Sequence, residues 1–393
     1  MFNALAILNA FAILGALIWF GVYFMPFKAW RYRENLDSDP KDEDTDLSRV
    51  TVLTPARNEE AEIGTTFSAL RTQGSGFQAI LVDDQSTDQT QAVARAALPS
   101  IKIIDGTQLP SGWTGKLWAL EQGRKHVTTP LILLMDADIR LEPGILKSLI
   151  AHQQKHELSF VSLMAFLRMQ SFWEKLLIPA YIYFFKLLYP FALGNNPRFK
   201  KFAVAAGGCI LIETEVLDKL GGFAALHDAL IDDCTLAKKV KAAGYKTWMG
   251  TTHSVTSHRA YDSLNEIWNL VARFAFTYLR YNWILLGVCT ILMFAAYWAI
   301  PLALIFSDLP QKWTNFLWLG YALLFICYYP TVRFYRLNPL WTFLHPFAGT
   351  LYMAMTWSSA FRYASGRRSE WKGRTYDQNL VATEAPAKHK KSA

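Results

Sequence analysis

The feature that most constrains this chain is a set of four long runs that contain no Asp, Glu, Lys or Arg. The runs cover residues 1–27, 281–307, 313–332 and 337–361. Each is longer than the roughly 18 apolar residues that a helix needs to cross about 30 Å of hydrocarbon. We therefore predict an N-terminal transmembrane anchor at residues 1–27 and a transmembrane region of two or three spans over residues 282–361.

The basic residues beside these runs predict the orientation. Lys28, Arg31 and Arg33 directly follow the first run, and because positive charge is retained on the cytoplasmic side, the anchor should end in the cytoplasm. The basic tail at 362–393 holds eight Lys or Arg against three acids, most of the formal net charge of +8, so nucleic-acid binding is not predicted. If the chain crossed the membrane three times after a cytoplasmic domain, this basic tail would lie outside the cytoplasm, against the positive-inside rule. The run at 337–361 is therefore expected to be re-entrant or interfacial, unless the tail is an exception to that rule.

The central part of the chain has a different pattern. Residues 28–49 form a basic juxtamembrane segment and an acidic linker, and short β-branched runs then alternate with helical patterns up to residue 262. The predicted strands are 50–55, 79–84, 101–105 and 131–138, and the predicted helices are 59–73, 89–98 and 116–127. This alternation predicts a Rossmann-like α/β domain over residues 50–262, with a mostly parallel sheet covered on both faces. Such sheets bind ligands beyond the carboxyl ends of their strands.

Two aromatic-rich segments are predicted to lie in the membrane interface. Residues 172–193 include Glu174, Lys175 and Lys186, which is more charge than a transmembrane helix readily carries. The alternative is a buried core helix of the α/β domain. Residues 263–281 have a similar amphipathic pattern and lead into the second run.

Asp136 and Asp138 follow one of the predicted strands in the sequence MDAD. If the chain stays extended, carboxylates two residues apart point the same way. They can then share a hard divalent cation, Mg²⁺ or Mn²⁺, whose other oxygen ligands come from a diphosphate. The alternative is a pair of solvated acids at the end of a strand.

Two other strand ends carry acids. Asp84 closes a buried strand, where a nucleobase or a ribose hydroxyl would give it a partner. Residues 86–88 are expected to cap the helix that starts near residue 89. Residues 58–60 are expected to open another helix. The positive N-terminal end of that helix would stabilise their acids, which explains these acids without any contact with a ligand. Arg57 and Glu59 are candidates for contacts with a nucleotide.

Three further motifs supply candidate site residues. Lys116 lies at the mouth of a helix in GWTGK, where backbone N–H groups and a lysine make an anion site, although a surface lysine is an equal alternative. Gly207 and Gly208 permit close approach of the backbone to a ligand. Asp232 and Asp233 open a helix, either as N-terminal caps or with one of them as a general base for an acceptor hydroxyl.

In this order, TPARNEE, VDDQSTD, GWTGK, MDAD, AAGGC and IDDC resemble the motifs of membrane-bound family 2 glycosyltransferases with a GT-A fold. The resemblance covers about residues 50–260. The segment LPSGWTGKLWALEQG at 109–123, together with the hydrophobic layout, is most similar to the hopanoid-biosynthesis-associated glycosyltransferases of bacteria. This resemblance implies an integral protein of the bacterial cytoplasmic (inner) membrane with its catalytic domain facing the cytoplasm.

The resemblance also implies roles for the donor-binding residues. Asp84 matches the acid that contacts the nucleobase, with the segment Pro55–Glu59 beside it. Asp136 and Asp138 match the acids that contact the ribose and the metal. The donor would be a nucleotide sugar, and we expect a UDP-sugar.

Two departures from the family pattern accompany the implied catalytic base. Asp233 matches the base, and Asp232 replaces the usual glutamate before it. The Q-x-x-R-W motif of membrane-bound relatives has no full counterpart, because Arg273 lacks the Gln and Trp, which argues against a processive polymer synthase. His258 and Arg259 are alternative contacts for the diphosphate.

The sequence therefore predicts an inverting, metal-dependent glycosyltransferase that acts on a membrane lipid, with a hopanoid as the implied acceptor. One alternative is transfer to a ceramide-like or polyprenyl-phosphate acceptor. The other is a membrane scaffold that keeps the fold without turnover.

Overall fold

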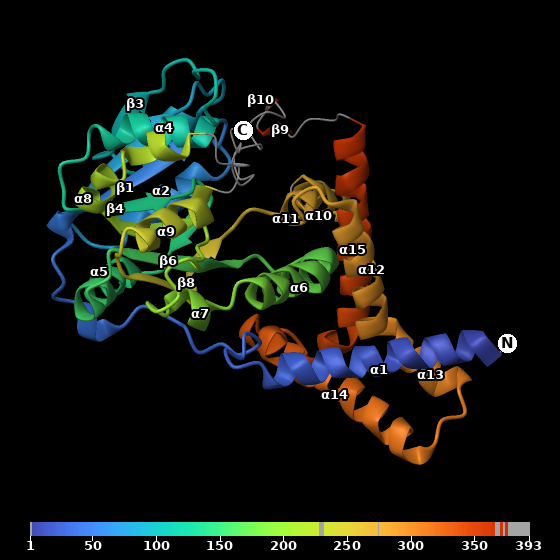
Figure 1. Cartoon of the computed structure of the whole chain (residues 1–393). Helices are drawn as coiled ribbons and strands as arrows, with labels where there is room; N and C mark the ends of the chain where they lie inside the picture. Colours follow the sequence, from blue (N-terminus) through green and yellow to red (C-terminus); the bar gives the residue numbers. More distant parts are fainter. Residues whose placement is uncertain (1, 228–231, 274, 366–369, 372–373, 376–393) are drawn as a thin grey trace, which may run out of the picture. The chain divides into compact units, whose positions relative to one another are not determined.

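The computed structural model describes residues 2–227, 232–273, 275–365, 370–371 and 374–375, and its chain divides into two compact units (Figure 1). We call them the helical unit and the sheet unit. The helical unit comprises Met1–Asn35, Leu167–Leu193 and Arg259–Arg367. The sheet unit comprises Leu36–Phe166, Gly194–His258 and Arg368–Ala393. The predicted basic tail at 362–393 lies almost wholly outside the described residues.

The sheet unit is built on one eight-stranded sheet in the order β3-β2-β1-β4-β7-β6-β8-β5. In that order the strands are Lys102–Asp105, Gln78–Asp83, Val50–Ala56, Leu131–Met135, Cys209–Glu213, Phe160–Leu167, Thr247–Ser257 and Ile139–Leu141. The first four are parallel, whereas β7 is antiparallel to β4 and β6, and β5 is antiparallel to β8. The predicted α/β fold is confirmed, and the sheet is mixed.

Helices cover both faces of this sheet because alternate strand residues point to opposite sides. Val52 of β1 belongs to the core formed with α2, α3 and α5, and the next residue, Leu53, belongs to the core formed with α4, α8 and α9. These helices are Ile63–Arg71 (α2), Thr90–Ala97 (α3), Gly115–Arg124 (α4), Ile145–His156 (α5), Thr214–Lys219 (α8) and Asp232–Ala242 (α9). Short 3₁₀ segments lie at Pro40–Asp42, Leu47–Arg49 and Gly222–Leu226.

One predicted helix start is wrong. Residues 58–60 precede α2, which begins at Ile63, and they form a turn. Glu60 does not cap that helix but accepts a hydrogen bond from the backbone N–H of Gln89 at 2.9 Å. The acids of this segment therefore link two neighbouring loops.

The helical unit consists of the long N-terminal helix, two helices from the middle of the sequence and the C-terminal helices. They are Phe2–Phe24 (α1), Phe172–Leu188 (α6), Phe191–Asn195 (α7, whose last residues belong to the sheet unit), Leu264–Ala272 (α10), Ala275–Tyr278 (α11), Trp283–Phe294 (α12), Ile300–Phe306 (α13), Gln311–Phe334 (α14) and His345–Ala364 (α15). A π-helical turn at Ala295–Ala299 joins α12 to α13, and a 3₁₀ segment at Pro339–Leu344 precedes α15. The two-residue strands Glu370–Trp371 (β9) and Arg374–Thr375 (β10) belong to the sheet unit.

Three helices of this unit are long and apolar enough to cross a membrane, namely Ala4–Phe24, Trp283–Phe306 and Gln311–Phe334. They coincide with the first three uncharged runs. The fourth run forms α15, which is not among these candidate spans. Close packing of α1 depends on small residues, since a Cβ atom at Gly320 of α14 would lie 2.6 Å from the Cβ of Ala16.

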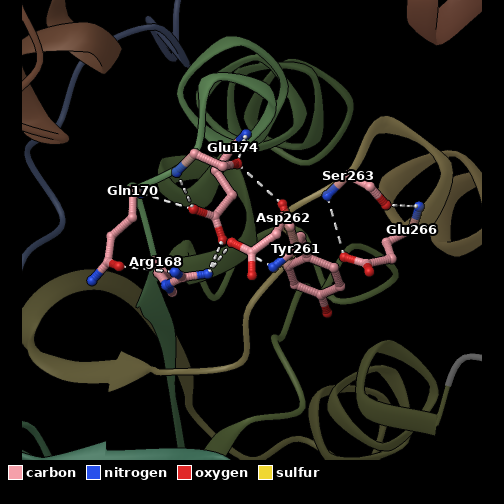
Figure 2. A network of polar contacts seen from close by, with 8 residues as sticks. Arg168, Gln170, Glu174, Tyr261, Asp262, Ser263 and Glu266 are labelled. Carbon is pink, nitrogen blue, oxygen red and sulfur yellow. Dashed lines mark hydrogen bonds and ion pairs between the residues drawn. The ribbon is translucent and has the colours of Figure 1, made fainter.

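Segment 172–193 lies mostly in α6, and much of this helix is buried in the core of the helical unit. Glu174 is 0% exposed, and its carboxylate accepts hydrogen bonds from the backbone N–H groups of Gln170, Ser171 and Tyr261 at 2.8, 2.9 and 2.9 Å. The guanidinium of Arg168 lies 3.1 Å from the same carboxylate (Figure 2). Glu174 thus ties together the two places where the chain enters the helical unit, near Leu167 and near Arg259.

Replacing Glu174 by Ala is expected to lower the free energy of unfolding by about 3–5 kcal/mol, because Arg168 and three backbone N–H groups would lose their buried acceptor. Glu266 provides the matched control, since it makes the same capping-box contact with Ser263 but is exposed (Figure 2). Glu266→Ala should cost only about 1 kcal/mol. Thermal unfolding of both variants in detergent measures the difference, and equal losses would contradict the role assigned to Glu174.

Candidate active site

A small cleft lies in the sheet unit at the carboxyl ends of β1 and β4. Five of the residues proposed from the sequence line it, although they are far apart in the chain. They are Pro55, Lys116, Asp136, Gly207 and Asp233. Parallel strands bring their carboxyl ends to one edge, which explains the position of Pro55 and Asp136. Of the other three residues, Lys116 lies at the start of α4, Gly207 in the segment before β7 and Asp233 at the start of α9.

Charged groups of opposite sign meet at the centre of the cleft. The ammonium of Lys116 lies 2.6 Å from Oδ1 of Asp136, and both side chains are about one-third exposed or less. A Cβ atom at Gly207 would lie 3.4 Å from Oδ2 of Asp233 and 3.4 Å from Nζ of Lys116. Oδ1 of Asp233 accepts a hydrogen bond from the backbone N–H of Cys234 at 2.7 Å. Gly207 therefore leaves room between a cation and a carboxylate.

The backbone from Asp136 to Asp138 does not stay extended, as the sequence argument required. It forms a turn in which the N–H of Ile139 donates to the carbonyl of Asp136 at 3.2 Å. The two carboxylates consequently have different partners: Asp136 pairs with Lys116, and Oδ2 of Asp138 accepts from the hydroxyl of Ser257 at 2.9 Å.

A histidine lies next to Asp138. The backbone N–H of His258 donates to the carbonyl of Asp138 at 3.2 Å. Its Nε2 lies 2.8 Å from Oε2 of Glu62, and its buried Nδ1 has no hydrogen-bond partner within the described parts of the chain. The carboxylate of Glu62 favours the tautomer that carries its proton on Nε2, which leaves a lone pair on Nδ1.

The loops after β1 and β2 form a second part of the site. Asp84 is 1% exposed, and its backbone carbonyl accepts from the guanidinium of Arg57 at 2.6 Å. Glu59 is 8% exposed, and its backbone N–H donates to the hydroxyl of Thr90 at 2.9 Å. The contact of Arg57 with the carbonyl of Asp84 joins the loop after β1 to the loop after β2. Each of the two loops carries one buried acid, Glu59 on the first and Asp84 on the second.

The remaining proposed residues lie in different places. Gly208 directly precedes β7, and its carbonyl accepts a hydrogen bond from the backbone N–H of Asp136 at 3.1 Å. Asp232 begins α9, and its side chain is outside the described residues. Arg259 and Arg273 belong to the helical unit, outside the unit that contains the cleft.

The sequence argument missed two polar residues and the apolar wall of the cleft. Ser257 and Glu62 had no local signal, because each reaches the turn at Asp136–Asp138 only through the pairing of distant segments. The apolar wall includes Phe223, Leu226 and Leu236. Beside the cleft, burial raises the pKa of the Cys209 thiol to about 12, so this thiol is not a nucleophile at neutral pH.

The residues present fit a divalent cation that is held jointly with a substrate. Within the described segments, no three His, Cys, Asp or Glu side chains gather to hold a metal by themselves. Mg²⁺ sites of nucleotide enzymes often use only one or two carboxylates and complete their shell with phosphates and water. Asp138 has such a carboxylate, and His258, whose backbone N–H donates to the carbonyl of Asp138, has a buried Nδ1 with no hydrogen-bond partner in the described structure.

Part of the chain is similar to known glycosyltransferases. Residues 51–221 match the family described as Glycosyl transferase family 2. Among curated proteins, a 4,4'-diaponeurosporenoate glycosyltransferase of Staphylococcus haemolyticus is 29% identical over 106 residues, and one of Staphylococcus aureus is 36% identical over 91 residues. These alignments cover 27% and 23% of this chain and only 28% and 24% of the relatives.

The fold is similar to that of a solved mannosyltransferase from Pyrobaculum calidifontis in complex with GDP-Man and Mn²⁺. The match has a TM-score of 0.53 at 20% sequence identity and covers 92% of this chain and 99% of that chain. At this identity the likeness concerns the fold alone. Residues 51–221 are thus similar to glycosyltransferase family 2, and the chain has a GT-A-like fold.

Proposed function

We propose that this protein is a glycosyltransferase that moves a sugar from a nucleotide sugar to a membrane lipid. The observation that carries the proposal is the convergence of Lys116, Asp136, Gly207 and Asp233 on one cleft at the carboxyl edge of the sheet. The family match of residues 51–221 supports the reaction class, and the three apolar helices support a lipid acceptor.

The nucleotide would bind across the loops after β1 and β2. Asp84 and Glu59 are buried acids that can accept hydrogen bonds from a base and a ribose, with Pro55 and Arg57 beside them. Asp136 is proposed to contact the ribose. The ammonium of Lys116, at the start of α4, would then exchange part of its contact with Asp136 for a phosphate oxygen. We propose a UDP-sugar as the donor.

The chemical step would be a single inverting displacement. The acceptor hydroxyl gives its proton to Asp233 while its oxygen forms a bond to the anomeric carbon. The bond from that carbon to the nucleoside diphosphate breaks on the opposite face, and Lys116 stabilises the charge that develops on the phosphate. Asp232 and the backbone of Gly207 and Gly208 would shape the acceptor side of the cleft.

Asp138 and His258 would hold Mg²⁺ or Mn²⁺ together with the diphosphate. Such a cation neutralises the negative charge that accumulates on the leaving group. Relatives in the solved structures support divalent metal use, since the Pyrobaculum enzyme was solved with Mn²⁺. Arg259 and Arg273 remain proposed contacts for the diphosphate.

For the acceptor we propose a hopanoid, which the segment at 109–123 and the hydrophobic layout favour. The curated relatives are named for diaponeurosporenoate, another lipophilic acceptor. We also propose that the protein resides in the bacterial cytoplasmic membrane and that the sheet unit faces the cytoplasm, where Lys28, Arg31 and Arg33 would place the end of α1.

The direct test uses the purified full chain in detergent with lipid extract. Release of nucleoside diphosphate from UDP-sugars and from GDP-Man should require a lipid extract and should stop with EDTA. Absence of release with every donor would overturn the glycosyltransferase proposal. Lipid mass spectrometry of a deletion strain would then name the acceptor, because its unglycosylated form should accumulate.

Glu62→Gln is expected to weaken the affinity for Mn²⁺ by about 10–100-fold, because Glu62 orients the ring of His258 and keeps its proton on Nε2. Mn²⁺ titration of nucleoside diphosphate release measures this shift. Activity should return at saturating Mn²⁺, whereas a purely structural loss of activity would persist at every Mn²⁺ concentration. Glu142→Gln serves as the control, since Glu142 pairs only with Arg140 among the described ion pairs. Unchanged Mn²⁺ dependence of Glu62→Gln would contradict the assignment.

A further inference from the structure

A second pocket, of about 270 Å³, lies in the sheet unit and shares no lining residue with the cleft. It lies where β6 and β8 begin, because the N–H of Ser159 donates to the carbonyl of Lys246 at 3.0 Å. Strand β8 runs from Thr247 at this pocket to Ser257 beside Asp138. Eleven residues of strand span about 35 Å, so the pocket and the cleft lie at opposite edges of the sheet.

The pocket is lined by three lysines and by aromatic rings. The lysines are Lys200, Lys241 and Lys246, and the rings include His152, His156 and Trp248. His152 packs between the other two rings, with ring centres 4.6 Å from His156 and 4.5 Å from Trp248. Its buried Nε2 has no hydrogen-bond partner in the described structure.

The charge of the pocket is positive at neutral pH. Burial and the neighbouring His156 and Lys155 lower the pKa of His152 to about 4, so its ring is neutral. Lys241 is 3% exposed and donates to the backbone carbonyls of Gly194 and Phe202. The acid that pairs with a lining lysine is Glu157, whose carboxylate lies 2.8 Å from Lys246 at the rim. The pocket is thus lined by three lysines, of which one, Lys246, pairs with an exposed carboxylate.

A short loop beside the pocket combines cations with an exposed ring. Residues 196–202 read NPRFKKF, and Phe199 between Arg198 and Lys200 is 42% exposed. The two bonds from Lys241 close the base of this loop. In sequence the loop begins three residues after Leu193, the last residue of a segment of the helical unit. Basic residues with an exposed aromatic ring are the usual composition of a segment that lies on an anionic bilayer.

We propose that this pocket binds the phosphate group of an anionic membrane lipid, held by Lys200 and Lys246, while Phe199 enters the bilayer surface. A lipid fits better than a free phosphate because the ring of Trp248 lines the pocket together with the lysines, and Phe199, next to Lys200 in the sequence, is an exposed apolar ring. The chain also reaches the loop directly from the unit that carries the membrane-type helices. The site would dock the sheet unit at the membrane.

The test titrates the detergent-purified full chain with short-chain phosphatidylglycerol, and with phosphatidylcholine and inorganic phosphate as the comparison ligands. The wild type should prefer phosphatidylglycerol. The double variant Lys200→Gln/Lys246→Gln should bind it about 30-fold more weakly, since each lysine near an anionic surface contributes about 1 kcal/mol and 1.4 kcal/mol is tenfold. Glu157→Gln should bind it more tightly, because the competing carboxylate is removed.

The matched control is Lys102→Gln/Lys125→Gln, which removes two exposed lysines that do not line the pocket. It should bind phosphatidylglycerol as the wild type does. Equal affinity of the Lys200/Lys246 variant and the wild type would overturn the proposal, and so would weaker binding by Glu157→Gln. Saturation by inorganic phosphate at the same concentration as phosphatidylglycerol would reassign the pocket to a soluble phosphate compound and overturn the lipid assignment.

Discussion

Asp233→Asn is expected to lower the rate of sugar transfer by about 10²–10⁴-fold and to leave the affinity for the nucleoside diphosphate unchanged. Asparagine keeps the shape of the side chain and can still accept from the N–H of Cys234, but it cannot take a proton from the acceptor hydroxyl. The carboxylate lies across Gly207 from Lys116, so it is on the acceptor side of the cleft rather than at the base-binding loops.

Two measurements separate these effects. Single-turnover transfer to lipid gives the rate, and calorimetric titration with UDP gives the affinity. Asp44→Asn, an exposed acid of the linker, is the control and should change neither. Full activity of Asp233→Asn would remove Asp233 as the base. A parallel loss of UDP affinity would indicate a role in donor binding instead.

Asp138→Ala is expected to weaken metal-dependent binding of the nucleoside diphosphate by at least about 100-fold. Oδ2 of this carboxylate accepts from the hydroxyl of Ser257 at 2.9 Å, and the backbone carbonyl of Asp138 accepts from the N–H of His258 at 3.2 Å. Removal of the carboxylate should also remove the effect of EDTA, because the remaining binding no longer depends on the cation. Calorimetric titration with UDP in Mn²⁺ and in EDTA measures both quantities.

Ser257→Ala distinguishes ligation by Asp138 from its positioning. Loss of the hydroxyl leaves the carboxylate in place, so we expect a smaller change of about 10-fold with the EDTA effect intact. Should Asp138→Ala bind UDP with wild-type affinity and the same response to EDTA, the metal role of Asp138 would be wrong.

The sequence predicted those parts of the fold that depend on local patterns. Buried, β-branched runs marked the strands that became β1 to β4, and their polar ends marked Pro55 and Asp136. The turn after Asp136 was not predicted, because the extended backbone that the D-x-D argument assumed competes with a hydrogen bond to Ile139. The site roles of these residues stay predictions until the variants are measured.

Strands β5 and β8 were not predicted because their signal is not local. β5 has three residues, and β8 has the mixed sequence TWMGTTHSVTS, so neither stands out as a buried strand. They become part of the sheet by pairing with each other across more than one hundred residues, with Ile139 opposite Ser257. Ser257 and His258 reach Asp138 through this pairing.

The position of β8 has a consequence for how the protein is made. It lies between β6 and β5 in the sheet, yet it is the last of the eight strands to be synthesised. A nascent chain that ends at residue 221, where the family match stops, exposes the edge of β6 and leaves β5 without its partner. Exposed strand edges pair with other chains. The sheet unit therefore completes its folding only after the ribosome has passed residue 257, and fragments cut at residue 221 are poor candidates for expression on their own.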